Sequence, residues 1–169
     1  MGAAMTEIER IVRELEEEHG GHPWHGPSRA EVLSDVSVEE AARRPSANGH
    51  SIWALVLHMN GWTREVARRV REGDPREPVG GDWPRPPKPT EAAWRAAVDS
   101  LAQGHRDVVA AIRSSSPGRL DEHAGTSGDA SLGSGVTCRV MLHGLAQHDA
   151  YHTGQISLLK RLFRDGAAS

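Results

Sequence analysis

The sequence predicts an all-α protein, a four-helix bundle with long crossover loops. Long Ala-, Arg-, Glu- and Leu-rich segments carry apolar residues at helical spacing. Pro-, Gly- and Ser-rich stretches divide these segments and predict loops between helices. Segments with the period-two alternation of strands are absent. A chain of 169 residues fits one domain, which we expect to span residues 1–169.

The first third of the chain predicts one long helix and two short ones. The long helix runs from Thr6 to Glu18 with an apolar stripe on one side, and Gly20 and Gly21 follow it. Short helices are expected from Ser28 to Leu33 and from Val38 to Arg43.

The second long helix is expected from Ile52 to Arg71, with His50 or Ser51 at its start. The segment Gly73–Pro89 then holds six of the ten prolines, so a helix cannot continue through it. We expect a semi-extended crossover that Trp83 pins to the body of the domain.

The third long helix is expected from Thr90 to Arg113 and the fourth from Thr137 to Phe163, with a polar, glycine-rich connection over Ser114–Gly135. Two such long connections argue against a simple up-down-up-down bundle. One face of the fourth helix is predicted to be apolar except at its middle; its residues are Val136, Val140, Gly144, His148, His152 and Leu159.

Composition excludes several classes of partner. A net charge of −3 and a pI of about 6.4 give no electrostatic footprint for nucleic acid. No apolar run approaches the length that spans a membrane, and the charged N-terminus does not fit a signal peptide. A single cysteine, Cys138, suits a reducing compartment. We therefore expect a cytoplasmic protein without nucleic-acid or membrane partners.

The strongest chemical signal is a histidine pair near the C-terminus. His148 and His152 are four residues apart, so on a helix both imidazoles leave the same face and can converge on one ion. His58 lies at the edge of the apolar face of the second long helix and supplies a third nitrogen. Histidines that only pack or face solvent fit the same spacing, and the residues alone leave both interpretations open.

Three neutral imidazoles suit Zn, Ni, Fe, Co or Cu and are poor ligands for Mg or Ca. Three protein ligands also leave positions open for water or substrate, as in catalytic zinc sites. The spacing therefore predicts, as one of the two interpretations, an open divalent transition-metal site at His58, His148 and His152.

Other polar residues are candidates for the surroundings of the metal. Gln155 could hold a metal-bound water or a histidine proton. Trp62 is expected to wall the pocket, His50 to cap the helix or line the pocket rim, and Glu65 to pair with Arg68 and Arg69 or act as a base. The remaining candidate is His25, which could line the site but fits a surface loop better.

Three further residues have no expected part in binding the ion. We expect His143 to miss the ion, Cys138 to be a small buried residue and Asp149 to be a carboxylate at the surface or at an interface. No residue can be assigned a catalytic role from the sequence.

Two segments carry a resemblance to a known family. Residues 48–59 read NGHSIWALVLHM and are followed by Trp62, and residues 143–156 read HGLAQHDAYHTGQI. Both resemble helix motifs of the DinB/YfiT-like family. The connecting segments WHGPS at 24–28 and GDWP at 81–84 also resemble parts of one branch of it.

The resemblance implies a four-helix bundle, frequently a homodimer, in which His58, His148 and His152 hold a divalent metal. Family members with known chemistry include transferases and isomerases that use a low-molecular-weight thiol such as bacillithiol, mycothiol or glutathione. Despite the damage-inducible name of the family, nothing in the sequence indicates DNA chemistry.

Three hypotheses follow for the function. The first is a metal-dependent enzyme, a thiol-dependent transferase or a hydrolase, in which zinc or nickel, or else iron or cobalt, activates a thiol or a water. The second is a metal-binding or stress-response module without turnover. In the third, the metal only staples the second and fourth long helices together. A fourth protein ligand, such as His50 or Glu65, would favour the staple.

Overall fold

The structure is a computed structural model and describes residues 4–125 and 135–166. Its helices are α1 (Glu7–Gly20), α2 (Arg29–Leu33), α3 (Val38–Ala42), α4 (Ile52–Glu72), α5 (Glu91–Ser114), the 3₁₀ helix η1 (Pro117–Asp121) and α6 (Cys138–Asp165). Within these ranges there is no strand, only an isolated bridge between His123 and Thr137. The all-α prediction is confirmed. Part of the predicted 114–135 connection, residues 126–134, lies outside the described residues.

Hydroxyl side chains start the long helices. Each N-cap oxygen accepts a hydrogen bond from a backbone N–H in the first turn, which otherwise has no partner. The four caps are Thr6, Ser51, Thr90 and Thr137. Ser51, rather than His50, therefore caps α4, and the His50 side chain takes no part in this cap.

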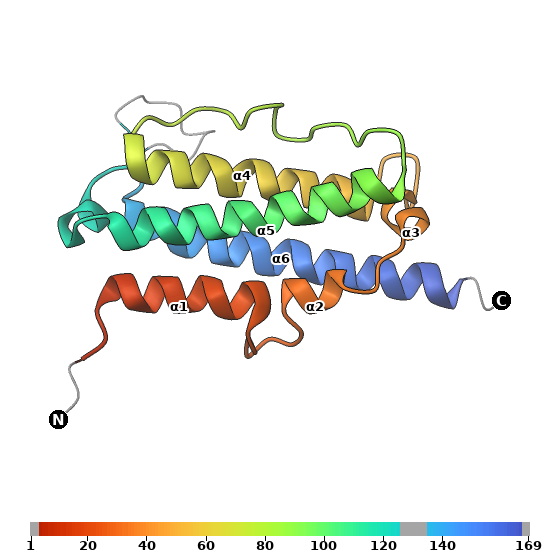
Figure 1. Cartoon of the computed structure of the whole chain (residues 1–169), viewed down its shortest axis with the longest axis horizontal. Coiled ribbons are helices and arrows are strands. Elements are labelled where there is room, and N and C mark those ends of the chain that lie inside the picture. The colour runs from red at the N-terminus through yellow and green to blue at the C-terminus, as the bar shows by residue number, and fades with distance from the viewer. Residues whose placement is uncertain (1–3, 126–134, 167–169) are drawn as a thin grey trace.

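The four long helices form an elongated bundle in which α1 and α4 each pack against α5 and α6 (Figure 1). Helices α4 and α5 run in the same direction, so the chain between them must return along the whole bundle. Residues 73–90 make this crossover without helical structure. Its course carries Asp82 and Trp83 past the middle of α4.

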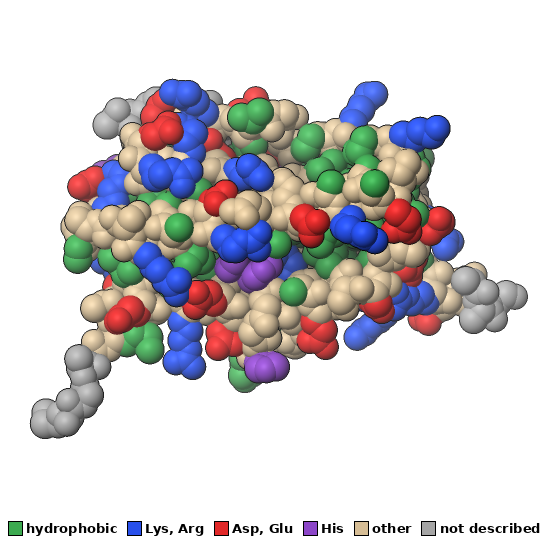
Figure 2. All heavy atoms as spheres, in the orientation of Figure 1, with side chains coloured by type: hydrophobic (Ala, Val, Ile, Leu, Met, Phe, Trp, Pro, Cys, Tyr) green, Lys and Arg blue, Asp and Glu red, His purple; other side chains and the backbone are tan. Residues whose placement is uncertain are grey.

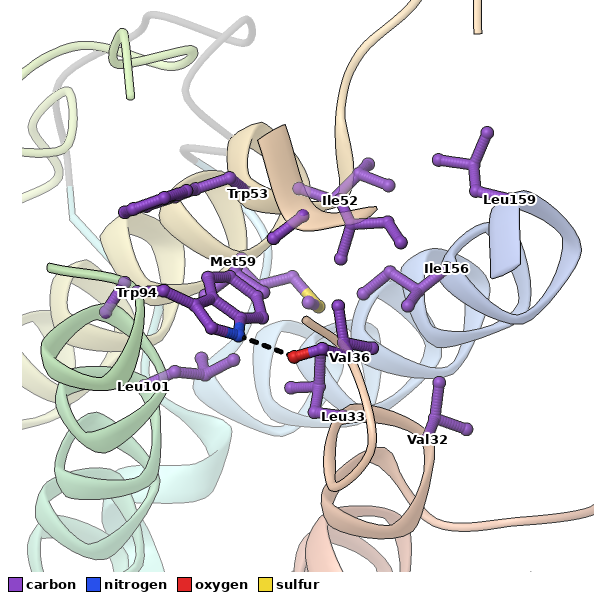
Figure 3. Packing of buried hydrophobic residues seen from close by; sticks show 14 of the residues in the cluster. Val32, Leu33, Val36, Ile52, Trp53, Met59, Trp94, Leu101, Ile156 and Leu159 are labelled. Carbon is purple, nitrogen blue, oxygen red and sulfur yellow. Dashed lines mark hydrogen bonds between the residues drawn. The ribbon is translucent and has the colours of Figure 1, made fainter. Parts of the chain in front are cut away.

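The hydrophobic core is split into two clusters. One cluster joins α2, α3 and the ends of α4, α5 and α6 around Trp53, Met59 and Trp94 (Figure 3). In it the indole N–H of Trp94 donates to the carbonyl of Val36 at 3.0 Å. The other cluster joins α1 to the opposite ends of the long helices. Between the two, midway along α4 and α6, most of the buried polar side chains gather.

The buried face of α6 differs from the predicted one. Val140 is 55% exposed, whereas Leu142, Leu145 and Asp149 are buried. Successive steps of four residues each drift by 40° around a helix, so Val140 lies about 120° from His152. The predicted stripe was therefore wrong over the first half of α6.

Charges of both signs are interspersed over the face shown in Figure 2, with no continuous basic patch on it. Histidine side chains appear there in the seam between α5 and the α1–α2 layer. None of the helices in the described ranges is both long enough and apolar enough to cross a bilayer.

Candidate metal centre

Three histidines converge between α4 and α6. His58 projects from α4, and His148 and His152 project from α6 one turn apart. Their candidate ligand nitrogens all lie within 4.8 Å of one another, and no second such group of His, Cys, Asp and Glu occurs in ranges 4–125 and 135–166. His58 and His152 are buried, whereas the side chain of His148 keeps 27% exposure. The cluster is thus open on the His148 side.

Each imidazole faces an acceptor with its Nδ1 atom. His58 Nδ1 lies 2.7 Å from the backbone carbonyl oxygen of Asp82, and His152 Nδ1 lies 2.7 Å from Oε1 of Gln155. His148 Nδ1 lies 3.5 Å from Oδ1 of Asp149, but no hydrogen bond joins these two atoms. A carbonyl oxygen only accepts, so the contacts of His58 and His152 assign their protons to Nδ1 and leave the lone pair on Nε2.

The lone pair on Nε2 of His58 points towards His148. Nε2 of His58 and Nε2 of His148 are 2.9 Å apart. Without an ion, Nε2 of His148 can donate a hydrogen bond to this lone pair, and with the His148 proton on Nδ1 both Nε2 atoms can bind one cation. Two nitrogens bound to one ion at about 2.1 Å lie about 3.0–3.4 Å apart, so a small opening would admit the ion. The donor set therefore fits a divalent transition metal.

Burial keeps the histidines neutral, as metal ligands must be. Desolvation lowers the pKa of His152 to about 4 and also lowers the pKa of His58. The lone pairs on both Nε2 atoms are therefore available at neutral pH.

Asp149, which we expected at the surface or an interface, is instead 2% exposed. Its Oδ2 accepts a hydrogen bond from Nη1 of Arg29, which is 1% exposed. Arg29 also pairs with Glu18 at 3.3 Å, and Glu18 accepts from the hydroxyl of Thr153 at 3.1 Å. A buried ion cluster from α1, α2 and α6 thus lies directly behind His148.

Two more histidines extend this cluster to the opposite side of the bundle. Nη2 of Arg29 donates to Nδ1 of His19 at 3.0 Å, and His19 stacks on His105 with ring centroids 4.1 Å apart. Burial lowers the pKa of His19 to about 4 and that of His105 to about 3, so both rings are neutral at pH 7. Sequence reasoning missed this whole group.

The crossover covers the cluster on the α4 side, as expected for Trp83. The Trp83 indole is sandwiched between His58 and His50, with ring centroids at 3.9 and 3.7 Å. Trp62, which we expect to wall the pocket, does not line the cavity beside His152. Its indole N–H donates instead to Oδ1 of Asp82 at 2.6 Å, which fixes the loop whose carbonyl holds His58.

A cavity of 330 Å³ adjoins His152. His50 and Trp83 line its rim, and the pocket rim is one of the two positions that we expect for His50. Gln155 lies beside His152. Aliphatic side chains form much of the remaining wall.

Other predicted residues lie elsewhere. His25 is exposed and lines a different cavity, between α1 and α6. Glu65 is buried and bonded to Arg68 and Arg69, the pairing that we favoured. His143 pairs with Glu14 at 2.7 Å and does not join the cluster.

Comparison with known proteins identifies one family whose model matches this chain. A model described as the DinB superfamily matches residues 29–156. The crystal structure of a DinB-like protein from Bacillus subtilis, YjoA, superposes with a TM-score of 0.65 and 16% identity over 91% of this chain and 92% of that one. This likeness concerns the fold. No curated protein matches the chain at a significant level.

Proposed function

The chain belongs to the DinB superfamily, and from its three-histidine cluster we propose that it is a metal-dependent enzyme. His58, His148 and His152 would hold the ion through Nε2. Zinc or nickel suits this donor set best, and iron or cobalt would also fit. The reaction classes that we propose are thiol-dependent group transfer and hydrolysis.

The observation that carries the proposal is the contact between Nε2 of His58 and Nε2 of His148 at 2.9 Å. The Asp82 carbonyl holds the Nδ1 proton of His58, so the Nε2 lone pair of His58 points at His148, and a candidate ligand nitrogen of His152 lies within 4.8 Å of both. Three imidazole nitrogens gathered in this way form the donor set of an open transition-metal site.

Once bound, the ion would lower the pKa of a coordinated water or thiol and so supply a nucleophile at neutral pH. The protein holds the ligands in place. The Asp82 carbonyl and Gln155 hold the Nδ1 protons of His58 and His152, and such partners orient metal-binding imidazoles. Trp83 shields His58 from solvent, and the cavity beside His152 gives a substrate room.

Two features favour an enzyme over a structural staple. The cluster contains three ligands, without a fourth carboxylate or imidazole among the described residues, so coordination positions remain open. His148 is partly exposed, and a cavity adjoins His152. Structural zinc sites are instead closed by four protein ligands.

The test is elemental analysis of protein purified without added metal, for the native chain and for His58→Ala, His148→Ala and His152→Ala. His143→Ala is the matched control, because His143 lies on the same helix but pairs with Glu14. We expect a transition metal in the native protein and in the control, and its loss from the three variants. Full occupancy in all three would end the proposal.

A second measurement separates catalysis from stapling. Low-molecular-weight thiols are screened by thermal shift against metal-loaded and chelated protein. A thiol that stabilises only the loaded form supports thiol-dependent transfer. Outright unfolding of the chelated native protein would instead mean that the ion is structural.

A further inference from the structure

The cavity beside His152 carries no charged side chain among its lining residues. Other cavities of the molecule differ in this respect. One beneath α2 and α6 is lined by Asp35, Lys160 and Arg164, and another between α1 and α6 is lined by Glu17 and Glu18. The absence of charged side chains is thus a property of this cavity and not a general property of the surface.

The walls of this cavity are aliphatic on one side and aromatic on the other. Leu55, Leu158 and Leu159 supply the aliphatic surface. Trp83 supplies an aromatic surface whose orientation is fixed by stacking on His50 and His58. Rigid apolar walls stabilise a bound apolar body, and they would not compensate the desolvation of an ionised group.

Neutral polar groups lie at two points. Oε1 of Gln155 accepts the Nδ1 proton of His152, so the Gln155 NH2 group remains to donate to a ligand. Tyr151, which is 65% exposed, also lines the cavity and carries a neutral hydroxyl. Both can bind a carbonyl or hydroxyl oxygen, and neither can neutralise a carboxylate or phosphate.

We propose that this cavity binds an uncharged small molecule with an aromatic or aliphatic body and a hydrogen-bond acceptor. The inference rests on the proposed function in that it assigns the substrate side of the same site. An anionic thiol such as glutathione would not fit this cavity. If a thiol takes part, it approaches the ion from the partly exposed His148 side, and the cavity holds the molecule that it attacks.

Benzamide and benzoate are the probes, because they share a ring and nearly a shape but differ in charge. Binding is measured by ligand-detected NMR, with metal-loaded and with chelated protein. The chelated sample matters because benzoate can coordinate a metal directly. We expect benzamide to bind both samples in the millimolar range, and benzoate to bind the chelated protein at least fivefold more weakly.

Leu158→Arg places a positive charge on the cavity wall, at a position 57% exposed, where it leaves the core intact. Leu162→Arg is the control, because it adds the same charge one turn further along α6, at 53% exposure and outside the cavity, so that any effect of the charge on pairing of two chains along the outer face of α6 is common to both variants. The benzamide preference should fall at least fivefold in the first variant only. Equal binding of both probes by the chelated native protein, no benzamide binding, or equal effects of the two variants would overturn the proposal.

The outcome of this experiment is independent of the outcome of the metal test. A protein that holds no metal but prefers benzamide in a Leu158-dependent way would refute the proposed function and keep the cavity assignment. A protein that holds the metal through its three histidines but binds benzoate as well as benzamide after chelation would keep the proposed function and refute the cavity assignment.

Discussion

Asp149 links the exposed ligand of the candidate centre to the buried ion cluster. Its Oδ1 lies 3.5 Å from Nδ1 of His148, while its Oδ2 accepts from Arg29. One carboxylate thus lies beside a proposed metal ligand and is itself held by a guanidinium that solvent does not reach. Carboxylates that hold the free N–H of a ligating imidazole commonly tune metal affinity.

We therefore expect Asp149→Asn to weaken metal binding about 10–100-fold. An amide can still accept from Nδ1, but it lacks the charge that favours the Nδ1 proton. The dissociation constant is measured by chelator competition on folded protein. Glu18→Gln is the control, because it alters the same Arg29 cluster without touching His148, and its affinity should stay close to native. Equal losses in both variants would mean that Asp149 acts only through stability.

Trp83→Ala should also weaken metal binding, by several-fold, while most of the bundle stays intact. The indole stacks on His58 and anchors the segment whose Asp82 carbonyl accepts the His58 proton. The matched control is Trp24→Ala, since Trp24 is fully exposed in a loop. Metal titration of both variants checks the expectation, and identical affinities would show that the crossover does not position His58.

Much of the fold could be predicted because its determinants are local. Threonine and serine caps, prolines in residues 73–89 and apolar spacing lie within a few residues of the boundaries that they set. The three clustered histidines were found for a similar reason. His148 and His152 are one turn apart, and His58 lies at the edge of an apolar stripe.

The cluster of Glu18, Arg29 and Asp149 could not be predicted in the same way. Its pair of Arg29 with Asp149 joins residues 120 positions apart, and locally Glu18 and Arg29 resemble ordinary surface residues. One local pattern in the sequence does indicate that Asp149 is buried. Asp149 shares a helix face with the apolar residues Leu142, Leu145 and Ile156, at successive spacings of three, four and seven.

Arg29→Met should cost about 3–5 kcal/mol of unfolding free energy. The substitution leaves two buried carboxylates, Glu18 and Asp149, without their shared counter-charge. Urea unfolding of the chelated native protein and of the variant measures this loss of unfolding free energy. Arg10→Met removes an exposed pair with Glu7 and should leave stability nearly unchanged. A loss no larger than that of the control would contradict a structural role for the cluster.

Glu18 should make stability fall as pH rises from about 4.5 to about 7. Burial raises its pKa from the ordinary value of about 4.5 to about 7. Between these values the folded chain binds a proton that the unfolded chain has released, so the stabilisation is present at the acid end and is lost as pH rises through 7. In Glu18→Gln this dependence disappears.

The measurement is urea unfolding of chelated native and Glu18→Gln protein at several pH values across that window. Chelation removes pH effects that come from metal binding. The stability of the variant relative to the native chain should rise with pH by about 1–3 kcal/mol. Contributions from the histidines cancel in the difference. A difference that stays flat across the window would show that Glu18 is ionised throughout.

The outer face of α6 supports the expected homodimer. Four large apolar side chains are more than half exposed there: Val140, Tyr151, Leu158 and Leu162. At 100° per residue they lie within about 40° of one another around the helix and extend about 33 Å along it. Exposed Gln147 interrupts this stripe between Val140 and Tyr151, but four large exposed apolar side chains on one helix face are still unusual on a surface that stays in water.

We expect two copies to pair along this stripe, each burying the side chains of the other. Leu162→Glu should shift the protein towards monomer, because it puts a carboxylate into the pairing surface. Val79→Glu is the control, as Val79 is fully exposed on the crossover and away from α6. Sedimentation across micromolar concentrations measures the association. A native protein that is already monomeric at the highest of them would remove the dimer, while leaving the metal centre untouched, since all three ligands come from one chain.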